Sequence, residues 1–188
     1  MSAPATVAER HHHAHGPANR RRRVLETVAP LFVRFPDRLA ETAVVVLHDA
    51  YGLTAPIEDC CRELARHGHL AVAPILYYQT GGRAFTTDQP DLARSAWRRL
   101  RHADLVADVA GAMDYLERRC GVPASSTALL GFGESPHLAA EIATGYRLGA
   151  VVGAENVCGL SQDWAAVRHR AAEVHRALSP THHRREQQ

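Results

Sequence analysis

Short apolar runs alternate with amphipathic segments between residues 43 and 154, and this alternation limits the fold more than any other feature. The apolar, β-branched runs lie at 43–48, 69–74, 127–132 and 148–154. Helical periodicity follows at 56–68, 91–101, 103–119, 135–144 and 161–178. Strands that alternate with helices in this way form a parallel sheet with helices on both faces. We therefore predict a three-layer α/β fold with four parallel strands, and an additional strand near 28–35.

The two ends of the chain differ in composition from the part between them. Residues 1–23 include HHHAH at 11–15 and RRRR at 20–23, and residues 179–188 read SPTHHRREQQ. Segments of this kind bury too little apolar surface to offset the loss of chain entropy. We therefore predict one domain over 24–178, between a disordered tail over 1–23 that folding does not need and a polar tail over 179–188.

Composition excludes several classes of protein. No apolar run reaches the about 18–20 residues that a membrane helix needs, and the polar N-terminus lacks the apolar stretch of a secretion signal. The formal net charge is +2, and all 22 basic residues are arginine, which indicates coding bias and not a nucleic-acid surface. We therefore expect a cytoplasmic protein with no membrane and no nucleic-acid partner.

Cysteine and histidine are the residue types that would hold a metal ion. The four cysteines contain no C-x-x-C pair, so they form neither a zinc knuckle nor a disulfide framework and are interpreted as reduced thiols; they are Cys60, Cys61, Cys120 and Cys158. For the domain itself we predict no metal and no cofactor. A metal-binding tail is an open alternative, because imidazole is a good ligand for transition metals. Its candidate ligands are His11, His12, His13 and His15.

Three loops follow the carboxyl ends of predicted parallel strands, at 48–55, 74–90 and 131–136. In open α/β sheets, ligands bind at this edge. The third loop reads GFGESP, a tight glycine turn that leads from a strand into a helix. A turn of this kind presents the nucleophile in α/β-hydrolases. The residue at its apex, however, is Gly133.

The three loops together resemble those of the dienelactone hydrolase family of α/β-hydrolases. The chain reads HDAYG, APILYY and GFGESP where that family reads His-Glu-x-x-Gly, Ala-Pro-x-Leu-Tyr and Gly-Phe-Cys-x-Gly-Gly. The resemblance covers roughly residues 40–155. It implies an α/β-hydrolase-like fold with a mostly parallel sheet, truncated on its C-terminal side. It also implies a small ester, lactone or carboxylate as the ligand or substrate.

The resemblance also implies a set of ligand-binding residues at the strand ends. Asp49 stands where the family has a glutamate that contacts the nucleophile, and Gln79 stands where many members have an arginine for a substrate carboxylate. Arg83, four residues later, is a candidate replacement for that arginine. The full set is His48, Asp49, Tyr77, Gln79, Arg83, Gly133 and Glu134.

The nucleophile that the family needs is missing at its expected position. Gly133 stands where the family has its catalytic cysteine, and it has no side chain that can attack a carbonyl. Ser135 is the candidate substitute, and Asp49 is the other candidate catalytic residue. Pro136 follows Ser135 and has no N–H for an oxyanion hole. We therefore predict that Ser135 is a helix N-cap.

The acid and the base of a catalytic triad cannot be assigned by spacing. The later histidines are His137, His169, His175, His182 and His183. We predict that His169 and His175 face solvent, because their helix is rich in arginine. No strand after 148–154 is apparent that would carry an orienting carboxylate to the site.

Three functions stay open on these observations. The first is a degenerate, catalytically impaired hydrolase homologue, a pseudoenzyme that retains a small-ligand cleft. The second is an active hydrolase of small esters or lactones, in which Ser135 or a partner chain completes the site. The third is a histidine-rich metal-binding or interaction protein. An uncovered sheet edge invites pairing, so we also predict a homodimer through the truncated edge.

Overall fold

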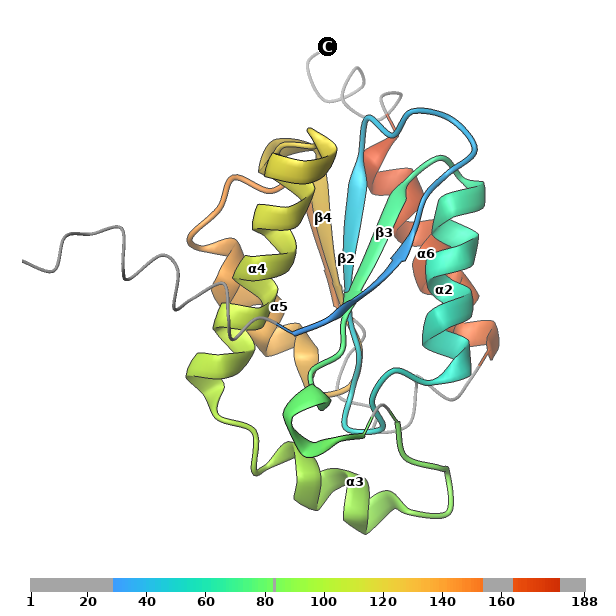
Figure 1. The fold of residues 1–188 in the computed structure, drawn as a ribbon. Coiled ribbons are helices and arrows are strands. Elements are labelled where there is room, and N and C mark those ends of the chain that lie inside the picture. The colour runs from blue at the N-terminus through green and yellow to red at the C-terminus, as the bar shows by residue number, and fades with distance from the viewer. Residues whose placement is uncertain (1–28, 83, 154–163, 180–188) are drawn as a thin grey trace, which may run out of the picture.

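A computed structural model of the chain describes residues 29–82, 84–153 and 164–179. It shows three layers, with the sheet in the middle and helices on either side (Figure 1). The sheet has five strands in the order β1-β3-β2-β4-β5. They are β1 (Leu31–Arg34), β2 (Ala43–Leu47), β3 (Leu70–Pro74), β4 (Thr127–Gly131) and β5 (Ala150–Gly153). The last four are mutually parallel, as predicted, while the additional strand β1 runs antiparallel to β3.

Helices cover both faces of the sheet, which confirms the predicted fold class. Figure 1 shows α2 (Ala55–Arg66) and α6 (Trp164–Leu178) on one face, and α4 (His102–Cys120) and α5 (Ser135–Ala143) on the other. The short helix α3 (Pro90–Trp97) lies beyond the carboxyl ends of the strands. The helix predicted over 91–101 ends earlier, at Trp97, and the extended Arg101 is the N-cap of α4.

The core has two halves because successive strand residues point to opposite faces. Val45, Leu47 and Leu129 pack toward α4 and α5. Val44, Val46 and Leu130 pack toward α2 and α6. Strands that are buried on both faces read as continuous apolar runs, which is why these strands were visible in the sequence.

The thiols within the described residues are free. Cys60 and Cys61 are buried on α2, and Cys120 is half-buried. Burial raises the pKa of Cys61 to about 12 and also raises the pKa of Cys60, so neither supplies a thiolate near neutral pH. Cys158 lies outside the described residues.

Parts of the chain that carried sequence predictions lie outside the described ranges. They include residues 1–28 and 180–188, so the division into one domain and two tails stays a prediction. Among the helices that are described, none is long and apolar enough to cross a bilayer.

Candidate active site at the strand ends

His48 follows directly after β2 and is fully buried. Its Nδ1–H donates to the carbonyl oxygen of Asp49 at 2.8 Å, because a carbonyl only accepts. Its Nε2 then accepts the backbone N–H of Leu76 at 3.3 Å. Burial lowers the pKa of His48 from 6.5 to about 4. The imidazole is therefore neutral at pH 7, and both of its nitrogens are engaged by the backbone.

Tyr77 comes from the loop after β3 and packs on His48. The two ring centroids are 5.6 Å apart and the rings are stacked. The Tyr77 hydroxyl donates to the carbonyl of Ala50 at 2.8 Å. Burial, together with the carboxylates of Glu134 and Asp49, raises the pKa of Tyr77, so it stays a neutral phenol. The side chain ties the two loops together.

Gly133 forms the elbow between β4 and α5. Its φ is +55°, in the left-handed region that glycine adopts without a steric penalty. A Cβ added at Gly133 would lie only 2.5 Å from the Cβ of Asp49. The position where a nucleophilic side chain would begin is therefore occupied by Asp49.

The backbone amides of the loop between β2 and α2 are bound by carboxylates of the same chain. The N–H of Ala50 donates to Glu134 Oε2 at 3.1 Å. The N–H of Tyr51 donates to Asp49 Oδ1 at 2.9 Å. Backbone amides in this loop could bind an anionic group of a ligand, but in this structure they already bind the carboxylates of Glu134 and Asp49.

Ser135 is fully buried and its hydroxyl donates to the carbonyl oxygen of His48. The prediction that Ser135 is the N-cap of α5 is wrong: Ser135 is the first helical residue, and Glu134 holds the N-cap position. The reason is the close approach of strand and helix at Gly131, where an added Cβ would lie 2.8 Å from the nitrogen of Pro136. Ser135 thereby lies at the end of β2, where its hydroxyl reaches the His48 carbonyl.

The comparison with known proteins identifies this arrangement. The model of the dienelactone hydrolase family matches residues 31–169. The chain belongs to the dienelactone hydrolase family. It is 26% identical over 94 residues to a protein of Yersinia pestis named as a carboxymethylenebutenolidase, covering 49% of this chain and 35% of that protein. An Escherichia coli K12 protein of the same name is 31% identical over 78 residues, covering 42% of this chain and 29% of that protein. The chain thus spans about a third of these relatives.

Solved structures agree with this assignment. The structure named m3DLH is 28% identical, with a TM-score of 0.53, and the match covers 64% of this chain and 51% of that chain. A protein of Klebsiella pneumoniae named as a dienelactone hydrolase is 22% identical with a TM-score of 0.51, over 79% of this chain and 76% of that chain. The second likeness supports the fold alone.

Five of the predicted site residues lie together in this dienelactone hydrolase-family protein. Contacts join His48, Asp49, Tyr77, Gly133 and Glu134 at the strand ends, directly or through Ala50. No sequence pattern predicted Trp97, whose ring lies edge-on to His48 with the two centroids 6.3 Å apart. An aromatic residue on a separate helix has no local pattern that assigns it to a site. Trp97 and Phe85 close the aromatic cluster around His48 and Tyr77.

Gln79 lies in a different cavity from the elbow. Its amide donates to the Tyr78 hydroxyl at 2.9 Å, and the side chain is exposed. The cavity has a volume of about 120 Å³ and is also lined by Thr80, Arg99, Arg101 and Asp108, among others. Arg83, the other residue that the family resemblance assigned to a carboxylate ligand, lies outside the described residues.

Where the structure describes them, the histidines of the C-terminal half do not supply a base at the elbow. His137 is exposed on α5, and His169 is exposed on α6 with Glu173 at 3.5 Å, as predicted for His169. The prediction for His175 is wrong: it is half-buried and contacts His69 at the amino ends of the strands. His182 and His183 lie outside the described residues. Within the described ranges, no group of three metal-ligating side chains is arranged to hold an ion.

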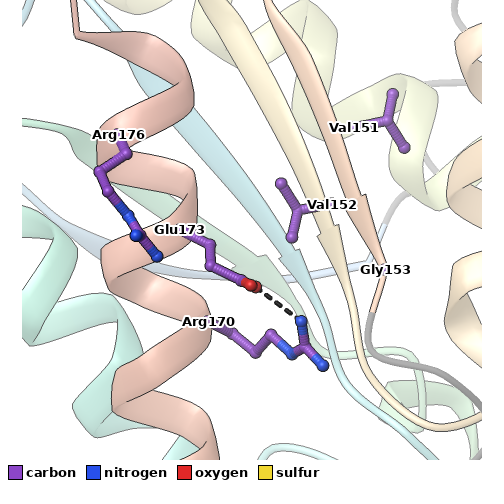
Figure 2. A pocket seen from close by; sticks show the side chains of 6 residues that line it. All are labelled: Val151, Val152, Gly153, Arg170, Glu173 and Arg176. Atoms are coloured by element: carbon purple, nitrogen blue, oxygen red, sulfur yellow. Dashed lines mark hydrogen bonds and ion pairs between the residues drawn. The ribbon is translucent and has the colours of Figure 1, made fainter.

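Strand β5 forms one edge of the sheet, next to α6 (Figure 2). Val151 is 44% exposed there, and a shallow groove of about 490 Å³ separates the strand from the polar side of α6. An ion pair between Arg170 and Glu173, 2.6 Å long, borders the groove. Pairing of two copies through this edge stays a prediction.

Proposed function

We propose that this chain is a dienelactone hydrolase-family protein that binds a small ligand and does not hydrolyse esters or lactones. The observation that carries the proposal is the 2.5 Å between the Asp49 Cβ and the place of a Cβ at Gly133. A cysteine or serine at this elbow would overlap Asp49. At this elbow, Gly133 offers no nucleophilic side chain, and Asp49 leaves too little space for one.

The occupied amides support the same proposal. In α/β-hydrolases, one N–H of the oxyanion hole comes from a loop between a core strand and the following helix. The corresponding loop here offers Ala50 and Tyr51, which donate to Glu134 and Asp49. Two carboxylates beside this loop would also repel the negative charge that develops on a carbonyl oxygen.

An active hydrolase that uses Ser135 is the alternative to this proposal. To act as the nucleophile, the Ser135 hydroxyl would have to be accessible to the substrate and would need an imidazole that accepts its proton. Ser135 is instead fully buried and donates to the His48 carbonyl. The nearby His48 imidazole uses both nitrogens on the backbone. These contacts favour the non-hydrolytic function over Ser135 catalysis, and an active site completed by a partner chain would meet the same obstacles.

A hydrolysis assay tests the proposal. We expect the wild type to turn over p-nitrophenyl acetate and dienelactone at no more than background rates, since loss of a triad nucleophile costs about a millionfold in turnover. Ser135→Ala, with Ser125→Ala at an exposed serine as the matched control, should change nothing in this assay. Ordinary esterase turnover that Ser135→Ala abolishes and Ser125→Ala leaves intact would refute the proposal.

The cavity beside Gln79 is the proposed ligand cleft. Arg99 and Arg101 border it together with Asp104 and Asp108, and Asp104 is paired with Arg101 at 3.6 Å. Among the described residues, Arg99 has no ion-pair partner and is therefore the cation that a ligand would meet. A small carboxylate fits this chemistry because arginine binds carboxylates in a bidentate manner. We expect glutarate to raise the melting temperature of the wild type, and Arg99→Gln to abolish that shift. Equal shifts with uncharged dimethyl glutarate, or an undiminished shift in Arg99→Gln, would exclude this cavity as a carboxylate site.

A further inference from the structure

Three histidines from separate elements meet at the amino ends of the strands, away from the elbow. His67 follows α2, His69 precedes β3, and His175 lies in the last turns of α6. His69 is only 4% exposed, and His175 is half-buried. The hydrolase-like site uses none of them, so the cluster needs an explanation of its own.

The contacts form a continuous chain of side chains. Thr42 Oγ1 lies 2.6 Å from His69 Nδ1, and His69 Nε2 lies 2.9 Å from His175 Nδ1. The ring of His175 stacks on the ring of His67, with centroids 4.5 Å apart. The cluster therefore joins α6 to the start of the sheet and to the end of α2.

The contact between His69 and His175 depends on protonation. At 2.9 Å the facing nitrogens share one hydrogen, so one donates and the other must have a free lone pair. If both rings are protonated, two N–H groups and two positive charges face each other. The hydrogen bond is then lost and replaced by repulsion, which little water screens at the buried His69.

The charged groups around the cluster do not offset this repulsion. On α2, Glu63 lies 3.4 Å from His67 Nε2, but the same carboxylate binds Arg66 at 2.5 Å. On α6, Glu173 is paired with Arg170, and Arg176 adds a further positive charge. Asp37 and Arg38, before β2, line a groove next to His67 and carry opposite charges. On the sheet side, His69 meets the uncharged Thr42.

We propose that His67, His69 and His175 form a latch that holds α6 on the sheet at neutral pH and releases it in acid. Helix α6 packs on the half of the core that lies between the sheet and α2, and its Ala171 and Val174 are fully buried there. Its release would expose the apolar surface of α2 and of the central strands. Stability of this half of the domain is thereby linked to pH.

The direction of the pH dependence follows from the pKa values. Burial, then the neighbouring His175 and His67, lowers the pKa of His69 from 6.5 to about 4. Burial and His67 also lower the pKa of His175. A released histidine takes up a proton near pH 6.5, whereas the latched His69 does so only near pH 4. The latch is therefore at full strength above pH 6.5 and weakens as the pH falls toward 4.

Hydrogen exchange measured by mass spectrometry tests the latch in the full-length chain, with EDTA present to exclude metal effects. We expect α6 to lose protection by about tenfold to a hundredfold near pH 4.5 relative to pH 7, after correction for intrinsic rates. Helix α4 serves as the internal reference and should lose much less. The double variant His69→Gln/His175→Gln should keep α6 protection nearly constant, whereas His137→Gln, at an exposed histidine, should respond like the wild type.

Two outcomes would overturn the latch. In the wild type alone, equal loss of protection in α6 and α4 would mean that acid unfolds the domain as a whole, and this test does not require any variant to fold. An acid response in His69→Gln/His175→Gln equal to that of His137→Gln would show that other groups carry the pH dependence.

Discussion

Replacing Gly133 by cysteine is expected to lower the free energy of unfolding by about 2–4 kcal/mol, because a side chain there adds both steric overlap and backbone strain. The new Cβ would meet the Asp49 Cβ at 2.5 Å, and a non-glycine residue would be forced to a φ of +55°. The variant should also remain inactive toward esters, since a thiol without an activating base stays mostly protonated at pH 7. Urea unfolding and an ester hydrolysis assay measure the two effects.

The position of the clash allows a sharp control for this prediction. The overlap involves the Cβ of Asp49, so Asp49→Gly relieves it and Asp49→Ala does not. In double-mutant cycles, Gly133→Cys should couple favourably to Asp49→Gly by about 1–3 kcal/mol, and much less to Asp49→Ala. Equal coupling to both variants would show that the two residues do not compete for space. Ester turnover by the single variant Gly133→Cys would contradict the second part of the prediction, because it would show that a base activates the new thiol.

His48→Ala is expected to destabilise the protein by about 3–5 kcal/mol, as truncation of a large buried ring usually does. The ring is fully buried between Tyr77 and Trp97, and its removal leaves the N–H of Leu76 without its acceptor. Urea unfolding at pH 7 gives the size of the loss. Because folding lowers the pKa of His48 from 6.5 to about 4, the loss should be constant above about pH 7.5 and should shrink as the pH falls through 6.5 toward 4.

Two companion variants separate packing from hydrogen bonding at His48. His48→Gln keeps an acceptor near Leu76 and should recover part of the loss. His137→Ala, at an exposed position on α5, should change stability by less than about 0.5 kcal/mol. A His48→Ala variant as stable as His137→Ala would contradict the buried position of the ring.

Local patterns in the chain were enough to predict the frame of the fold. The runs around Val45, Val72 and Leu129 are buried on both faces, and such strands are recognisable because every side chain must be apolar. The glycine turn at Gly133 predicted an elbow, since a strand that turns sharply into a helix needs a left-handed residue. The family motifs placed the same loops at one edge. All of these signals lie within a few neighbouring residues.

Contacts between distant residues decided the rest. Glu134 binds the amide of Ala50, which is 84 positions earlier, and Ser135 turns to the carbonyl of His48 instead of capping its own helix. His175 looked like a surface residue of an arginine-rich helix, yet it packs against His69. Residue type gives a side chain its hydrogen-bonding capacity, but the partner depends on which backbone groups the packed sheet and helices bring within about 3 Å. That proximity is a property of the tertiary structure alone.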